Sequence, residues 1–275
     1  MRDNANLLFG CTILGVALLM ALSAPILAPD DPYVQRLAAR LVPPAWYDGG
    51  SWSHPLGTDA LGRDMASRLV YGVRVSLLIG FGVTLLSGLI GSLLGLVAGF
   101  GTPAVDAAIM YLITVRLAVP VILVVLSVVA LAGSSLGLVI VVLGLVKWDH
   151  FAVVLRAATQ QVRAIDYVES ARAIGSTLPR IIRREILPNV FEPLLVVASL
   201  TMAEAILLEA ALSFLGLGVQ PPTPSWGLMI AEGKDFMFTD SWMITIPGTA
   251  LLVLVLGITL LSEGLREAFT PRRAA

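Results

Sequence analysis

The sequence predicts an all-α integral membrane protein with six membrane-spanning helices. Hydrophobic residues make up 57% of the 275-residue chain, charged residues only 13%, and the mean hydropathy is +0.89, well above the apolar share of a soluble domain. Six runs reach the roughly 20 apolar residues that a spanning helix needs, because lipid cannot satisfy exposed backbone N–H and C=O groups. The runs cover residues Leu7–Ala28, Val73–Phe100, Ala107–Leu131, Leu136–Leu155, Pro193–Leu217 and Trp242–Leu261.

The first run, within residues 1–28, is interpreted as a spanning helix that brings Asp30 to the outer side. A cleaved secretory signal is the alternative, since the small residues of ALSAP follow the apolar stretch, and it would place Asp30 on the same side. Residues 29–72 then form an external segment. Within it the spacing predicts an amphipathic helix on the outer surface. Its apolar side is expected to carry Leu61, Met65, Leu69 and Gly72, and its charged residues turned away from that side are Arg63, Asp64 and Arg68.

The second run has glycine at every fourth position, at Gly91, Gly95 and Gly99. Missing side chains along one helix face let another helix approach closely in lipid. This pattern predicts a tightly packed helix bundle. The alternative is that glycine is simply frequent in spanning helices.

Charges inside the third and fourth runs are costly in lipid, so each one is a candidate for function. Arg116 is followed by Pro120, which is expected to kink or break the third helix. Snorkelling of Arg116 toward the cytoplasm is the structural alternative to a role in a transport pathway. The turn at residues 132–135 reverses the chain, and Lys147 and Trp148 are interpreted as an interfacial anchor near the cytoplasmic end of the fourth helix.

The segment from 156 to 192 holds six of the chain's 18 Lys and Arg residues. Apolar residues at spacing three predict one amphipathic helix that stops at Gly175, and a second short helix that ends at Pro188. Placing this segment and both termini in the cytoplasm follows the positive-inside rule. Two helices that meet at a glycine form a compact knob, which predicts a partner protein.

The fifth run carries Glu204 near mid-bilayer and Glu209 five residues later. Glu204 could contact a peptide amino terminus or a metal cation, or it could be protonated or paired with Arg116 or Lys147. The following loop, QPPTPSWG at residues 220–227, is stiffened by three prolines and is expected to close over the pathway, unless it is only a connection.

Other function classes find little support in the residues. The one cysteine, Cys11, allows no intrachain disulfide and no thiolate metal cluster. The two histidines are predicted on opposite sides of the membrane, which argues against Ser–His catalysis, and H-E-x-x-H is not present. No Walker P-loop appears, so an ATP-driven transporter would need a separate ATPase chain. An ATP-independent secondary transporter remains the alternative from another class.

Four stretches carry a resemblance to a known family. The residues Glu169, Ala171, Gly175, Leu187 and Pro188 are similar to the EAA signature of permease subunits of ABC importers, with Ser170 in place of the second small residue. HPLGTDALGRDMASRLVYGVRVSLLIG and EAALSFLGLGVQPPTPSWG, together with EGLREAFTP, resemble the shorter, C-type permease subunit of dipeptide, oligopeptide and nickel importers.

The resemblance implies a type I ABC importer permease fold, with the transmembrane domain at residues 73–270 and a cytoplasmic tail at 271–275. It implies that the cytoplasmic knob, including Arg172, couples the chain to the ATPase. Two ATPase subunits that hold ATP and Mg, a second homologous permease and an extracytoplasmic substrate-binding protein are the implied partners. The implied location is the bacterial inner membrane, with lipid around the chain, no nucleic acid, no metal or cofactor bound and no catalytic site. Peptides lead as substrate, before nickel and glutathione-like solutes.

Overall fold

The computed structural model describes residues 5–165 and 177–269, and this part of the chain is almost entirely helical, with no strand. The helices are α1 (Ala5–Leu27), η1 (Leu37–Ala39), α2 (Met65–Phe100), α3 (Pro103–Leu117), α4 (Val121–Ala132), α5 (Leu136–Val146), α6 (Asp149–Arg163), α8 (Leu178–Ile181), η2 (Ile182–Ile186), α9 (Leu187–Phe214), α10 (Trp226–Gly233), η3 (Lys234–Phe236) and α11 (Trp242–Phe269).

Among the described residues, five helical stretches are long and apolar enough to cross a membrane: α1, α2, the stretch Leu136–Arg163 that contains α5 and α6, α9 and α11. The pair α3 and α4 passes the same test together, but it is bent by 77° at its break. Counting this pair as one span gives the six predicted spans.

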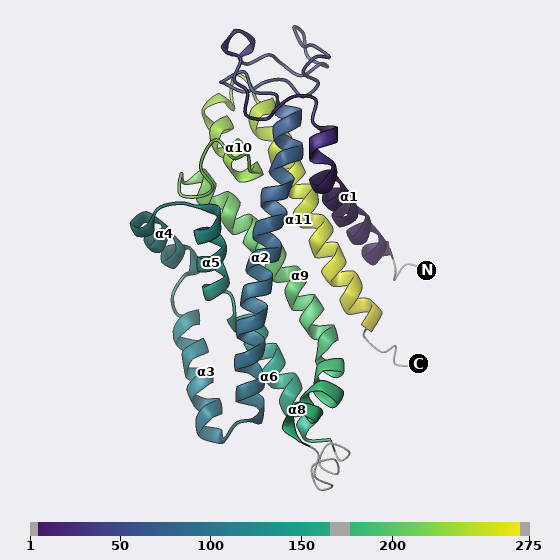
Figure 1. Cartoon of the computed structure of the whole chain (residues 1–275), viewed down its shortest axis with the longest axis vertical. Helices are drawn as coiled ribbons and strands as arrows, with labels where there is room; N and C mark the ends of the chain where they lie inside the picture. Colours follow the sequence, from purple (N-terminus) through teal and green to yellow (C-terminus); the bar gives the residue numbers. More distant parts are fainter. Residues whose placement is uncertain (1–4, 166–176, 270–275) are drawn as a thin grey trace.

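The long helices lie roughly side by side along the long axis of the molecule, and α2 runs along most of its length (Figure 1). The loops of residues 29–64 and α10 lie at one end, and the α2–α3 turn and α8 lie at the other. The external segment and α10 thus share one end and α8 lies at the other, which is the arrangement that the predicted alternation of sides requires. α1 packs along α11, where a Cβ on Gly10 would lie 2.3 Å from the backbone nitrogen of Leu261.

α2 begins at Met65, eight residues before the predicted start at Val73, and it runs for 36 residues. Asp64 caps it: one carboxylate oxygen accepts hydrogen bonds from the Ser67 N–H at 2.7 Å and the Ser67 hydroxyl at 2.8 Å. The predicted surface helix with Arg63, Asp64 and Arg68 turned away is wrong. Their side chains are buried: Arg63 and Arg68 pair with Asp59 and with Glu232 of α10, and Asp64 hydrogen-bonds Ser67 and His54.

The predicted break at Pro120 is confirmed: α3 ends at Leu117, and Pro120 is the N-cap residue of α4. The position of Lys147 differs from the prediction. It lies between α5 and α6, about 16 Å from Leu136 and about 24 Å from Arg163 at 1.5 Å per residue. The interpretation of Lys147 and Trp148 as an anchor at the cytoplasmic end is therefore wrong, because α6 continues the span to Arg163.

The three glycines Gly91, Gly95 and Gly99 lie where α2 meets α6. A Cβ would lie 2.1 Å from the Trp148 carbonyl oxygen at Gly91, and 2.7 Å from the Ala152 carbonyl oxygen at Gly95. Backbone atoms cannot rotate away as a flexible side chain can. A methyl group at these positions therefore requires the two helices to move apart.

The second predicted cytoplasmic helix is longer than expected. α8 is followed by the single π-helical stretch η2, which leads without interruption into α9. Pro188 does not end this helix; it lies in the first turn of α9, directly after the π-helical turn η2, where the regular i→i−4 hydrogen-bond pattern is already interrupted.

Candidate functional site

Four charged side chains form a buried network at the end of the molecule that carries α10; we call Asp59, Arg63, Arg68 and Glu232 the outer charge cluster. Arg63 donates from Nε to Asp59 at 2.6 Å and from Nη2 to Glu232 at 3.0 Å. Arg68 donates from Nη1 to Asp59, and to Glu232 at 2.7 Å. The cluster thus joins the loop before α2 to α10.

The two arginines of this cluster are buried, with Arg63 4% and Arg68 1% exposed. Burial lowers the pKa of the Arg63 guanidinium, but the Glu232 and Asp59 carboxylates outweigh it and the pKa is raised above its ordinary value. Two nitrogens of Arg68, Nε and Nη2, have no hydrogen-bond partner in the described part of the chain. The cluster is therefore held by charge pairing more than by complete hydrogen bonding.

A second set of charges lies inside the spans, at the breaks between helices. Arg116, at the end of α3, donates to Asp149 of α6 at 3.0 Å and to the Val146 carbonyl oxygen. Lys147 donates to Glu204 of α9. Arg116 thus does not snorkel to the cytoplasm. Of the alternatives predicted for Glu204, the structure shows the ion pair with Lys147.

The Lys147–Glu204 ion pair, which we call the mid-span pair, is asymmetric. The Lys147 side chain is 10% exposed and the Glu204 side chain is 45% exposed. Glu204 lies about 25 Å along α9 from Leu187 and about 15 Å from Phe214. The molecular surface near the middle of α9 therefore carries an exposed carboxylate.

Glu209 has a different environment, since it is 1% exposed. Its Oε1 accepts hydrogen bonds from Ser213 at 2.7 Å and from Ser225 at 3.1 Å. Ser225 also caps α10, accepting from the Leu228 N–H at 3.0 Å. Glu209 therefore fixes α10 on α9, and the loop at residues 220–227 packs onto the bundle, where Trp226 donates to the Leu69 carbonyl oxygen at 2.8 Å.

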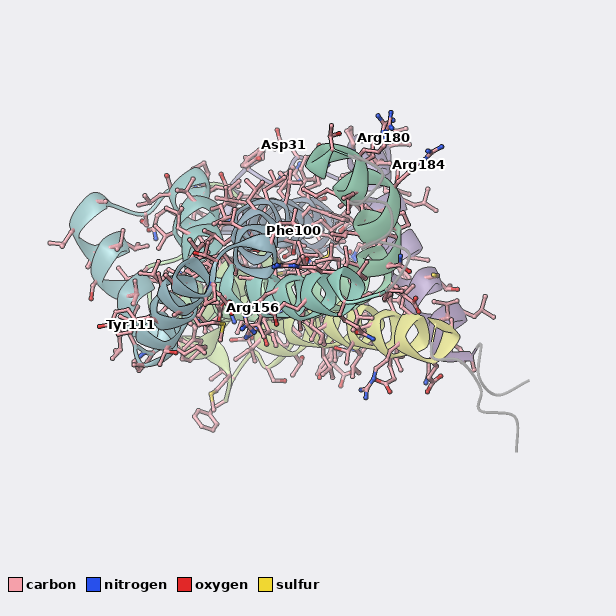
Figure 2. The ribbon with its side chains drawn as sticks, turned by 90° about the horizontal axis from the view of Figure 1, so that it is seen from below. Asp31, Phe100, Tyr111, Arg156, Arg180 and Arg184 are labelled. Carbon is pink, nitrogen blue, oxygen red and sulfur yellow. The ribbon has the colours of Figure 1, made fainter. Side chains whose placement is uncertain are left out.

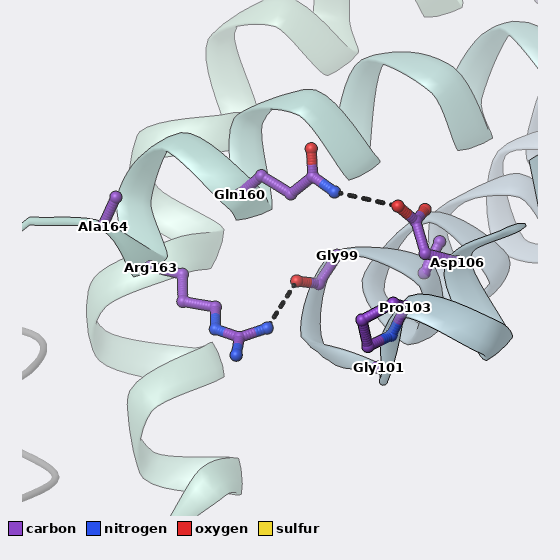
Figure 3. A pocket seen from close by; sticks show the side chains of 8 residues that line it. Gly99, Gly101, Pro103, Asp106, Gln160, Arg163 and Ala164 are labelled. Atoms are coloured by element: carbon purple, nitrogen blue, oxygen red, sulfur yellow. Dashed lines mark hydrogen bonds between the residues drawn. The ribbon is translucent and has the colours of Figure 1, made fainter.

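The opposite end of the molecule is basic. Arg180, Arg183 and Arg184 are exposed, and Figure 2 shows Arg180 and Arg184 pointing away from the bundle. Between the α2–α3 turn and α6 lies a cavity of about 570 Å³. Figure 3 shows Arg163 at its edge, bonded to the Gly99 carbonyl oxygen at 3.3 Å, and Gln160 bonded to Asp106 at 3.3 Å.

Comparison with known proteins decides the family. Residues 91–275 match the model of the binding-protein-dependent transport system inner membrane component. The chain belongs to this family. It is similar to the dipeptide transport system permease protein DppC of Haemophilus influenzae (39% identical, 98% of this chain and 92% of that protein) and of Escherichia coli K12 (42%, 98% and 90%). The di/tripeptide transport system permease protein DppC of Pseudomonas aeruginosa is 40% identical over 98% of this chain and 89% of its own length.

The permease also shares its fold with a solved transporter. A chain of the MetNI methionine ABC transporter, in inward-facing crystal forms, superposes with TM-scores of 0.60 and 0.57. In the first comparison the match covers 75% of the permease and 98% of that chain, at 19% identity. The predicted type I importer permease fold is confirmed.

The candidate residues of the permease are described only in part. Glu169, Ser170, Ala171, Arg172 and Gly175 lie outside the described residues, whereas Leu187 and Pro188 form the start of α9. The outer charge cluster was not predicted from the sequence. The sequence does contain a signal for it, since Asp59, Arg63 and Arg68 lie in one polar stretch next to a long apolar helix. Once α2 is extended to Met65, these charged side chains lie at the end of that helix and need partners of opposite charge.

Proposed function

We propose that this chain is the permease subunit of an ABC importer that forms half of the translocation pathway for dipeptides and oligopeptides. The observation that carries the proposal is the similarity, over 98% of the chain, to permeases named for dipeptide and di/tripeptide transport. The MetNI likeness supports the fold but not the substrate, because its identity is only 19%.

The remaining components of the importer are other chains. A second, homologous permease supplies the other half of the pathway, and an extracytoplasmic binding protein delivers the peptide. Two cytoplasmic ATPase subunits bind ATP and Mg, so the permease needs no cofactor and no catalytic site. Six spans, counting the bent α3–α4 pair as one, support a half-pathway for each permease.

Coupling to the ATPase takes place at the basic end of the molecule, at the EAA loop with Glu169, Ala171 and Gly175. The exposed arginines of α8 and η2 support a cytoplasmic position for this end. With the alternation of the spans, both termini are then cytoplasmic. α6 and α9, which enter and leave this region, transmit the movement of the ATPase to the mid-span pair and the outer charge cluster.

The test is reconstitution of the complete importer in proteoliposomes, after purification through a tag on this chain and identification of co-purifying chains by mass spectrometry. ATP hydrolysis and solute uptake are measured with binding protein loaded with a dipeptide, with Ni²⁺, or with neither. Dipeptide alone is expected to stimulate both activities. Stimulation by Ni²⁺ alone, or uptake without ATP, would contradict the proposal.

A further inference from the structure

Around Glu204, the exposed side of α9 is apolar. Leu200 and Leu207, 44% and 47% exposed, flank Glu204 on the same side of the helix. An ionised carboxylate near the middle of a span is costly in hydrocarbon, so such groups face a partner or a water-filled path. Lipid alone therefore does not explain the surface around the mid-span pair.

The same side of α9 leads to a cavity at the outer end. Leu215 lies eleven residues after Glu204, about 20° away around the helix and about 16 Å further along. It lines a cavity of about 480 Å³ together with Gln220, Glu232 and Lys234. One helix side thus runs from a cavity that holds the charged side chains of Glu232 and Lys234 to the exposed carboxylate in mid-span. Charged groups at both ends favour a path that admits water over a dry protein interface.

The exposed partner of the mid-span pair determines the chemistry that this path meets. The Lys147 side chain is 10% exposed, so the surface presents mainly the Glu204 carboxylate, and only one of its oxygens bonds to Lys147. A cationic group is therefore favoured. The described residues contain no group of three or more His, Cys, Asp or Glu side chains that could hold a metal ion, which favours an organic ammonium group over a metal cation.

We propose that Glu204 contacts the amino-terminal ammonium group of a peptide in transit, and that Lys147 is its positioning residue. This inference rests on the proposed import of peptides. Lys147 holds the carboxylate toward the path and shares it with the incoming ammonium group. Because the Glu204 carboxylate is shared between Lys147 and the peptide, its contact with the ammonium group stays weak. A weak contact suits transport, since each binding step along a pathway must also permit release.

The decisive experiment is a charge exchange in the reconstituted importer. Glu204→Gln is expected to lower dipeptide uptake about tenfold, the loss of about one charge-assisted hydrogen bond. Peptide-stimulated ATP hydrolysis is expected to continue. The double variant Glu204→Lys with Lys147→Glu retains the ion pair but presents a cation to the path, so it is expected not to restore uptake. Glu263→Gln is the control, because Glu263 is 52% exposed and pairs with Arg266 at 3.9 Å, away from the path.

Restoration of uptake by the double variant would overturn the inference, because the pair would then serve structure alone. Unchanged uptake by Glu204→Gln would also overturn it. An importer whose wild-type form takes up no peptide contradicts the proposed function instead, so the two failures are distinguishable.

A second measurement covers variants that fail to assemble. Cys11 is the free cysteine of the chain, so Glu204→Cys in a Cys11→Ser background leaves a single thiol. Modification with a methanethiosulfonate reagent that adds a negative sulfonate is expected to restore uptake, whereas a reagent that adds a trimethylammonium group is not. A thiol that neither water-soluble reagent reaches would show that this side of α9 meets no water, and that result would overturn the inference.

Discussion

Arg68 shows how a charge is accommodated at the end of a spanning helix. The side chain is 1% exposed, yet among the described residues only Nη1 finds hydrogen-bond partners, in Asp59 and Glu232. Its stabilising effect is therefore mainly the neutralisation of two carboxylates. Replacing both partners of a buried ion pair by apolar side chains often changes stability little. Removing only one partner costs much more, because it leaves an uncompensated charge in the interior.

Arg68→Met is therefore expected to lower the free energy of unfolding by about 3 kcal/mol or more. The measurement is thermal unfolding of the purified chain in detergent, followed by tryptophan fluorescence. The matched control is Arg36→Met, since Arg36 forms a pair with Asp30 at 2.7 Å with side chains 48% and 31% exposed. An exposed pair of this kind contributes about 0–1 kcal/mol. Equal, small shifts of the two unfolding midpoints would show that the outer charge cluster is hydrated.

At the scale of helices, the contact between α2 and α6 depends on missing side chains. The Cβ that Gly91 lacks would lie 2.1 Å from the Trp148 carbonyl oxygen, at the junction that also carries Lys147. Separation of the two helices here displaces the lysine relative to α9 as well. Helix packing and the mid-span pair are thus coupled.

Gly91→Ala is expected to destabilise the chain by about 1–3 kcal/mol through overpacking, and to lower uptake because Lys147 moves. The matched control is Gly248→Ala on α11, where a Cβ would meet nothing within 4 Å. There alanine is expected to be neutral or to stabilise the helix by up to about 1 kcal/mol. Unfolding midpoints and uptake of both variants are measured together. A stable Gly91→Ala chain would mean that α2 and α6 have room to separate at little cost.

The sequence predicts the long helices because each is an apolar run that lipid forces to satisfy its own backbone. It also predicts the break at Pro120, since proline removes a specific hydrogen bond. Two of the errors fall at charged residues. α2 extends past Arg68 because Glu232 neutralises its charge, and the helical span continues past Lys147 into α6 because Glu204 neutralises that charge. These partners are distant in sequence, so local periodicity carries no signal for them.

At the scale of the whole molecule, α2 links the two ends. It is 36 residues long, about 54 Å at 1.5 Å per residue. It contributes Arg68 to the outer charge cluster and packs its glycines on α6, which runs toward the basic end. Packed helices of the described part of the chain therefore connect that end with both the mid-span pair and α10, and we propose that they transmit a displacement.

A bulky side chain at the coupling loop tests this transmission. Gly175→Trp is expected to abolish uptake and peptide-stimulated ATP hydrolysis, because the side chain prevents the knob from entering the ATPase surface, while membrane insertion and the unfolding midpoint stay unchanged. Ala268→Trp is the control, since it places the same side chain at an exposed position near the end of α11. Uptake, hydrolysis and the yield of membrane-inserted chain are measured in parallel. Normal uptake by a well-inserted Gly175→Trp chain would show that the ATPase acts on another part of the permease. Crosslinking from Ser170 or Arg172 is a second check. If these crosslinks never capture an ATP-hydrolysing chain, the same conclusion follows.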